Sequence, residues 1–218
     1  MRLRAGRAAG RPGRPPGHGR HGPRLRAHRL GSSGVTRSGD GRALPPLVVN
    51  GEDRAAPADP RVSLLDFLRD GVGLHAVHAG CEQGACGACT VLLDGRAVRS
   101  CLVLAVSAAG RAVTTVEGIT PPGGLHPVQD ALVRHHGLQC GYCTPGLVMT
   151  AIDLLAATTG PLDETVVREA ISGNLCRCTG YSGIVTAIVE VSEGGAVSEG
   201  GAVSEGGAVS GRRAVTRR

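Results

Sequence analysis

Eight cysteines constrain the fold of this chain more than any other feature of its sequence. All of them lie between residues 81 and 178 of a chain of 218 residues, and they form two sets of four. The first set is Cys81, Cys86, Cys89 and Cys101, and the second set is Cys140, Cys143, Cys176 and Cys178. Such clustered spacing predicts two centres, each built by four thiol groups.

The first set has the spacing C-x4-C-x2-C-x11-C. This is the plant-type [2Fe-2S] pattern, in which three thiolates on one loop and a fourth further along hold two bridged irons. The loop also contains Gly84 and Gly87. Residues without a Cβ let backbone N–H groups approach an anionic cluster closely and adopt a positive φ. The pattern therefore strongly indicates an iron-sulfur loop.

The second set consists of two close pairs, each followed by a predicted helix start. Thr144 and Pro145 form an expected N-cap and first helical position, and Ser182 is an expected cap after the other pair. Helix N-termini favour thiolates and anionic groups. Two such pairs brought together by a helix bundle would enclose a second cluster.

Two other uses of the cysteines compete with this interpretation. Four disulfides would suit a secreted protein, but no apolar segment follows the basic start at Met1, and we expect a cytoplasmic protein. Structural zinc is the stronger rival because four-cysteine sites are common and a C-x2-C pair is an ordinary half-site. The three cysteines on one loop, and the single spacer between Cys176 and Cys178, favour iron-sulfur clusters instead.

Charge and composition divide the chain into four segments. Residues 1–45 hold 11 Arg and one acidic residue without a hydrophobic period, which predicts a disordered extension. Residues 47–190 hold 9 Arg and 14 acidic residues, so the basic excess lies outside the cysteine region. Residues 191–218 begin with a hexapeptide repeated three times, and we expect a low-complexity, flexible tail. Between the tails we expect one domain at 46–119 and another at 125–190.

The pattern of apolar and turn residues differs between these two domains. Strands are expected at 47–49 before a turn at Asn50-Gly51, at 90–93 before a turn at Asp94-Gly95, and at 112–116, with a short helix over 63–69. After a loop over 120–124 the period becomes helical, and Asp163 is expected to cap one of four helices. No apolar stretch is long enough to cross a membrane. Aromatic residues make up 1% of the chain, so a nucleic-acid surface built from stacked rings is excluded, and we expect no nucleic-acid partner for the central region.

Four segments together resemble the iron-sulfur subunit of the family of molybdenum hydroxylases that includes xanthine oxidase, carbon monoxide dehydrogenase and aldehyde oxidoreductase. They are GCEQGACGACTV at 80–91, SCL at 100–102, QCGYCTPG at 139–146 and GNLCRCTGY at 173–181. The resemblance covers residues 47–190 and both cysteine sets in order. It implies an α+β fold: a β-grasp, plant-type ferredoxin domain followed by a four-helix-bundle domain, each holding one [2Fe-2S] cluster.

The resemblance also implies a division of labour between subunits. A large partner subunit would bind molybdopterin and a medium partner subunit would bind FAD. Electrons would pass one at a time from molybdenum to the helical-domain cluster, then to the plant-type cluster, and then to FAD. Gln139 matches the family position that hydrogen-bonds the pterin, and Cys140 would be the ligand nearest to it. The sequence shows no phosphate-binding loop and no acid-base constellation of its own.

Two other functions stay open at this stage. A zinc-stabilised, RNA-associated module would use the basic extension, and a free-standing ferredoxin would carry electrons between diffusing partners. One departure from the family lies before Cys81, where His75 and His78 occupy a segment that usually ends in Lys. Since four thiolates already complete the first set, we interpret both histidines as loop residues. His126, His135 and His136 are interpreted as helix-surface groups.

Overall fold

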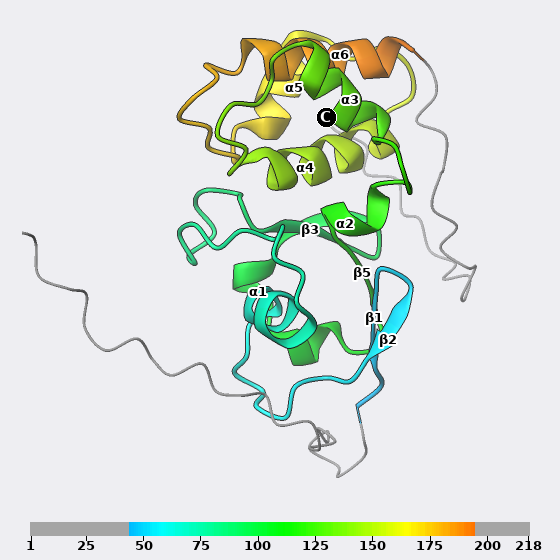
Figure 1. Cartoon of the computed structure of the whole chain (residues 1–218), viewed down its shortest axis with the longest axis vertical. Helices are drawn as coiled ribbons and strands as arrows, with labels where there is room; N and C mark the ends of the chain where they lie inside the picture. The colour runs from blue at the N-terminus through cyan, green and yellow to red at the C-terminus, as the bar shows by residue number, and fades with distance from the viewer. Residues whose placement is uncertain (1–43, 195–218) are drawn as a thin grey trace, which may run out of the picture.

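The computed structural model describes residues 44–194, which form a sheet half and a helical half (Figure 1). The predicted extension over 1–45 and tail over 191–218 therefore lie almost wholly outside the described residues. Two separate hydrophobic cores fill the halves. The first contains Leu47, Leu68 and Val91, and the second contains Leu132 and Ile184.

A five-stranded mixed sheet forms the first half. Its strands are β1 (Leu47–Val49), β2 (Glu52–Arg54), β3 (Thr90–Leu93), β4 (Arg96–Arg99) and β5 (Ala112–Thr114). The spatial order is β2-β1-β5-β3-β4, with β1 and β5 parallel and the other neighbouring pairs antiparallel. Hairpin turns at Asn50-Gly51 and Asp94-Gly95 join β1 to β2 and β3 to β4, as the sequence predicts.

The helical segment of the sheet half extends beyond its expected end. Helix α1 (Leu64–Asp66) continues directly into the π-helical turn η1 (Phe67–Val72). The Ser63 hydroxyl accepts a hydrogen bond from the Asp66 N–H and begins α1, while Gly73, at φ 88°, ends the segment. Two short 3-10 turns, η2 (Ser100–Leu102) and η3 (Ala105–Ala108), follow β4.

Strand β5 is shorter than expected because a side chain from another hairpin caps its end. The Asn50 Oδ1 atom accepts a hydrogen bond from the Thr115 N–H at 2.9 Å, and its Nδ2 atom donates to the Thr115 hydroxyl at 3.0 Å. Helix α2 (Val116–Ile119), which the sequence interpretation missed, begins directly afterwards. The strand prediction over 112–116 was thus wrong in its last two residues.

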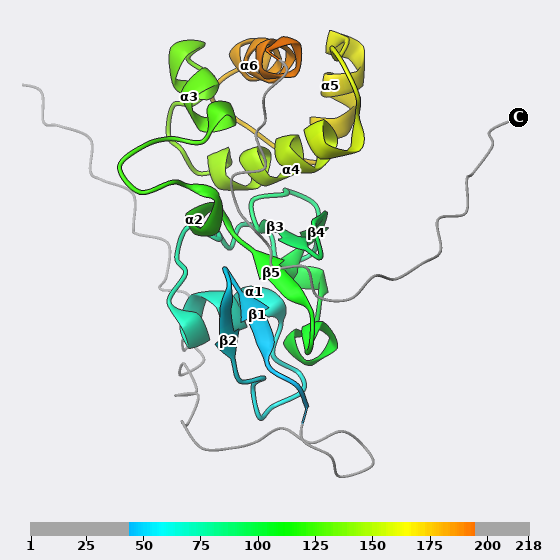
Figure 2. The same cartoon turned by 90° about the vertical axis from the view of Figure 1, so that its right-hand side faces the viewer.

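Helix α4 (Thr144–Ala157) lies between the sheet and the other helices (Figure 2). It packs on β3 on one side and on α3 (Pro127–Arg134) and α5 (Glu164–Ile171) on the other. Six consecutive residues in its first half, 146–151, are buried. Because this part of α4 is covered on all sides, its sequence is apolar around the whole helix. Helix α6 (Ser182–Glu193) packs against α3 and α5.

Two of the expected helix caps are wrong and one is confirmed. Cys143 occupies the N-cap of α4, and Thr144 is its first helical residue. Tyr181, not Ser182, is the N-cap of α6, and its φ of 70° turns the chain sharply without a side-chain cap. Asp163 caps α5 as expected, accepting a hydrogen bond from the Thr165 N–H. Helix α6 runs three residues past position 190, and in this last turn the Ser192 hydroxyl accepts a hydrogen bond from the Leu162 N–H.

The two halves touch where the first cysteine loop meets the start of α4. A Cβ atom added to Gly146 would lie 2.2 Å from the Gly87 carbonyl oxygen and 3.1 Å from that of Ala88. Only a residue without a side chain permits this approach. Within residues 44–194, no helix has the length and apolarity needed to span a membrane.

Gly146→Ala tests this contact. Alanine ordinarily favours a helix interior over glycine by about 1 kcal/mol. Here we expect a loss of about 1–3 kcal/mol in the free energy of unfolding, because the added methyl overpacks the interface. Urea unfolding of the full chain, followed by circular dichroism, measures the change. Gly194→Ala is the matched control, since its Cβ would meet only atoms at 3.7 Å or more; equal stability of the two variants would contradict the tight contact.

Candidate iron-sulfur sites

The hairpin of β3 and β4 brings the fourth cysteine of the first set to the other three. The register pairs Thr90 with Arg99, so the residues flanking the hairpin, Cys89 and Ser100, lie opposite each other. The Ser100 hydroxyl is buried and donates a hydrogen bond to the Cys89 carbonyl at 2.8 Å. This bond holds the two strand ends together, and Cys101 follows directly.

The loop before β3 directs several backbone N–H groups at one sulfur atom. The Cys86 N–H donates to Cys81 Sγ at 3.3 Å. Hydrogen bonds from the N–H groups of Gln83 and Cys86 lower the pKa of Cys81 to about 7, from an ordinary value of 9.0. Gly84 and Gly87 have φ values of 79° and 76°. The loop is thus shaped to stabilise anionic sulfur, as its glycines predict.

Thiols of the first set lie in interacting pairs. Cys81 interacts with Cys86, while Cys101 interacts with Cys89 and, more weakly, with Cys81. Burial, together with the neighbouring Cys89 thiol, raises the pKa of Cys101 to about 11. Cys89 is buried and the other three are partly exposed. All four predicted members of this set are therefore brought together.

The second set lies at the start of α4 and in the loop before α6. Cys143 is buried at the N-cap of α4, whereas Cys140 and Cys178 are exposed. Burial raises the pKa of Cys143 to about 12, with a further contribution from Cys176. The Cys140 thiol raises the pKa of Cys178. The set thus pairs Cys143 with Cys176 and Cys140 with Cys178, one pair further inside than the other.

Cys176 differs from the other thiols of its set. Burial opposes its ionisation, but the Thr179 hydroxyl and nearby backbone N–H groups bring its pKa below the ordinary value. The Thr179 oxygen lies 3.1 Å from Cys176 Sγ. The Tyr181 hydroxyl accepts a hydrogen bond from the Cys176 N–H at 2.7 Å and so holds this loop against α6.

The arrangement of the thiols fits a two-iron core. Each iron of a [2Fe-2S] cluster takes two cysteine ligands, so four thiolates need to approach in pairs. Among the residues that the structure describes, no three donors converge closely enough to hold a single metal ion. The hydroxyl of Thr144, next to Cys143, is buried without a hydrogen-bond partner. Such an orphaned donor beside the second set suits an anionic group there.

The position of Gln139 agrees with a role at the surface of the protein. Its side chain is exposed, and the neighbouring Cys140 is the exposed end of the second set. The assignment of Gln139 as a pterin contact stays a prediction.

A contact between His78 and Tyr142 escaped the sequence analysis. The two rings stack with centroids 4.6 Å apart, and His78 Nδ1 lies 2.7 Å from the Tyr142 carbonyl oxygen. The Tyr142 hydroxyl donates to the Ala79 carbonyl at 2.6 Å. This contact joins the segment before Cys81 to the loop between Cys140 and Cys143. The sequence signal that could have indicated this contact was the aromatic residue Tyr142 between Cys140 and Cys143.

The other histidines have local roles. His75 is exposed in its loop, as expected. His126 is the N-cap of α3: its Nδ1 atom accepts from the Val128 N–H, and burial lowers its pKa. Its interpretation as a simple surface group was therefore incomplete. His135 pairs with Glu190 across α3 and α6, and His136 is exposed.

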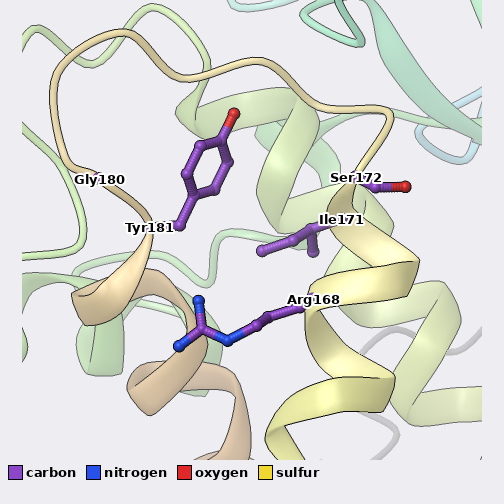
Figure 3. A pocket seen from close by; sticks show the side chains of 5 residues that line it. All are labelled: Arg168, Ile171, Ser172, Gly180 and Tyr181. Carbon is purple, nitrogen blue, oxygen red and sulfur yellow. The ribbon is translucent and has the colours of Figure 1, made fainter.

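A pocket of about 320 Å³ opens beside the second set, between α5 and the start of α6 (Figure 3). Figure 3 shows Arg168 and Ile171 of α5 and the Tyr181 ring bordering the same hollow. No cysteine lines it, and Arg168 pairs with Glu164 at 3.1 Å. The pocket is therefore separate from the thiol pairs.

Known proteins share both halves of this chain. Residues 47–112 match the family described as 2Fe-2S iron-sulfur cluster binding domain, and residues 115–189 match the [2Fe-2S] binding domain family. The small subunit of nicotine 6-hydroxylase from Paenarthrobacter nicotinovorans is 50% identical over 156 residues, covering 72% of this chain and 93% of that subunit. The chain belongs to the family of small iron-sulfur subunits of molybdenum hydroxylases.

Two further members of the molybdenum hydroxylase small-subunit family extend this likeness. Caffeine dehydrogenase subunit gamma from Pseudomonas sp. (strain CBB1) is 50% identical over 149 residues, covering 67% of this chain and 89% of that subunit. A chain of quinoline 2-oxidoreductase from Pseudomonas putida 86 superposes with a TM-score of 0.65 at 48% identity, covering 67% of this chain and 90% of that chain. None of these relatives is named as a zinc or RNA-binding module or as a free-standing ferredoxin.

The pKa differences between the thiols predict their reactivity in the metal-free full chain. Cys81 should be alkylated by iodoacetamide with a half-maximal rate near pH 7, because half of its thiol groups are ionised at that pH. Cys143, with a pKa of about 12, should stay unmodified at pH 7 to 9. Mass spectrometry of peptides after timed alkylation measures both rates. In denaturant the two should react alike; a difference that persists there would contradict a structural origin.

Proposed function

We propose that this chain is the electron-transfer subunit of a molybdenum hydroxylase. In this proposal, Cys81, Cys86, Cys89 and Cys101 hold a plant-type [2Fe-2S] cluster, and Cys140, Cys143, Cys176 and Cys178 hold a second one. The two clusters supply one-electron redox chemistry between a molybdopterin site and FAD on partner subunits. The residues of the chain hold the clusters, shield them and fix their relative position.

One observation carries this proposal: a direct hydrogen bond joins the two cysteine loops. The Leu175 N–H donates to the Cys86 carbonyl at 2.8 Å, and Leu175 precedes Cys176. A cysteine of each set is thus linked to the other through the backbone and a single hydrogen bond. Two metal centres held this close suit electron transfer within one chain better than two independent structural sites.

The family membership supports a finer description of the fold. We assign residues 46–119 to a β-grasp, plant-type ferredoxin domain, and residues 125–190 to a four-helix-bundle domain. Separate hydrophobic cores in the two halves support this division. Helices α3 to α6 contact one another around the second core.

Exposure suggests which cluster faces which partner. Cys140, Cys178 and Gln139 are exposed together, so this surface suits the molybdopterin-binding large subunit. Leu102, next to Cys101, is 65% exposed and offers an apolar contact beside the first cluster. We assign that surface to the FAD-binding medium subunit, in a cytoplasmic complex.

Iron analysis and electron paramagnetic resonance test the proposal. The reconstituted full chain should hold about four iron and four sulfide per chain, as two [2Fe-2S] clusters require. Cys178→Ser should remove the signal of the second cluster and keep that of the first. Cys101→Ser should do the reverse and is the matched control. Zinc in place of iron, or equal loss of both signals in each variant, would refute the assignment of two independent quartets.

Gln139→Ala tests the surface assigned to the molybdopterin-binding partner. Loss of one hydrogen bond, about 0.5–1.5 kcal/mol, should slow cluster reduction by substrate in the assembled complex roughly two- to tenfold. The spectra of both clusters should not change. Gln83→Ala, an exposed glutamine in the first cysteine loop, is the control and should keep the parental rate. Stopped-flow absorbance measures the rates; equal rates for the two variants would contradict the role of Gln139.

A further inference from the structure

Asn174 lies buried at the junction of the two cysteine loops. It is 1% exposed, and its side chain uses both of its polar atoms. Nδ2 donates to the Gly87 carbonyl of the first loop at 3.1 Å. Oδ1 accepts from Arg99 of β4 at 3.3 Å, and at 3.0 Å it shares the single hydroxyl hydrogen of Thr150 on α4 with the Gly146 carbonyl, which lies at 2.9 Å. One amide therefore ties together four parts of the chain.

On the first loop, the network is attached at the Gly87 carbonyl. It accepts hydrogen bonds from the Thr90 hydroxyl at 2.6 Å and from Asn174. A Cβ atom on Gly87 would lie 2.5 Å from the Gly173 carbonyl oxygen and 2.7 Å from Asn174 Nδ2. The two loops are thus in direct contact, with no room for a side chain between them.

Arg99 closes the network from the end of β4. Its guanidinium donates to the Thr90 hydroxyl at 2.7 Å and to the Gly173 carbonyl at 2.9 Å. A Cβ atom on Gly173 would lie 2.7 Å from this guanidinium. Hydrogen bonds from a charged donor are stronger than neutral ones, and this donor is partly buried.

We infer that Asn174 is a positioning residue that sets the distance and orientation between the two iron-sulfur clusters. The inference rests on the proposed function, because it assumes that both quartets hold clusters. Asn174 is two residues from Cys176, and its partner Gly87 lies directly after Cys86. The amide holds these two cysteine loops against each other beside the Leu175–Cys86 hydrogen bond.

A buried amide suits this role for a physical reason. Removing it leaves the Gly87 carbonyl, the Thr150 hydroxyl and Arg99 each without one of their partners in a site that excludes water. The loops then separate or admit water. Electron transfer between metal centres falls steeply with distance, and displacements of about 1 Å at a reacting centre can cost up to 100-fold in rate. Thiol ligation itself uses none of these atoms, so cluster content should survive.

Three variants of the complete complex with its partner subunits test the inference. Asn174→Asp keeps the shape and an acceptor for Arg99 and Thr150 but removes the donor to Gly87. Thr150→Val removes one donor to Asn174 and retains the volume. Asn174→Ala removes the whole network. Thr158→Val is the matched control, since the Thr158 hydroxyl bonds a carbonyl four residues earlier on α4, as that of Thr150 does, but has no bond to Asn174.

Two measurements report on the relation between clusters rather than on folding. The first is the magnetic splitting between the two clusters in the electron paramagnetic resonance spectrum of the fully reduced complex. The second is the rate of electron transfer from one cluster to the other after rapid mixing with substrate. Iron content and the midpoint potential of each cluster are measured alongside.

We expect Asn174→Asp to change the splitting and to slow inter-cluster transfer by about tenfold, with iron content and potentials kept. Thr150→Val should have a smaller effect and Thr158→Val none. Parental splitting and rate in Asn174→Asp and Thr150→Val would overturn the inference, as would losses fully explained by missing iron. If Asn174→Ala does not fold, the other two variants decide. Absence of clusters from the parental complex would instead overturn the proposed function.

Discussion

The contact between the two cysteine loops is the constraint on which this structure depends. Gly87 and Gly146 carry no side chains at the points where the first loop meets the helical half. The absence of side chains at these two glycines lets the Cys86 carbonyl reach the Leu175 N–H at 2.8 Å. A chain with two separate cores would otherwise be two domains on a linker. Here the polar backbone of one cysteine loop finds its hydrogen-bond partner in the other, so the two loops form a single unit.

The fold gives several of the cysteine thiols different pKa values. Each set combines groups whose pKa is lowered with groups whose pKa is raised: about 7 for Cys81 against about 11 for Cys101 in the first set. Backbone N–H groups stabilise the thiolate of Cys81, whereas burial keeps the proton on Cys101 and Cys143. The metal-free chain therefore avoids burying four like charges together. In the proposed function, iron would have to displace these protons, which would couple its binding to pH.

The sequence predicts much of this arrangement and misses its tertiary contacts. Strand residues 47–49 and 90–93 match the structure because turn signals at Asn50-Gly51 and Asp94-Gly95 bound them. The thiols of each set lie near one another, while their assignment as cluster ligands stays a prediction, and the family is the expected one. The predicted N-caps of α4 and α6 were wrong. Local residue preferences favoured Thr144 and Ser182, but the backbone places Cys143 and Tyr181 at these positions. The partners of Asn174 on the first loop and of Tyr142 lie more than 60 positions away, and no local pattern reports them.

The halves are also joined at an ion pair away from both loops, where Arg96 of β4 reaches Asp153 of α4 at 3.0 Å. Together with the Asn174 network, the Leu175–Cys86 hydrogen bond and the stacked rings of His78 and Tyr142, it joins the halves at several points. Bending the chain segment between β5 and α3 cannot by itself move one half relative to the other. Any movement of one half relative to the other would first have to break contacts at these attachment points.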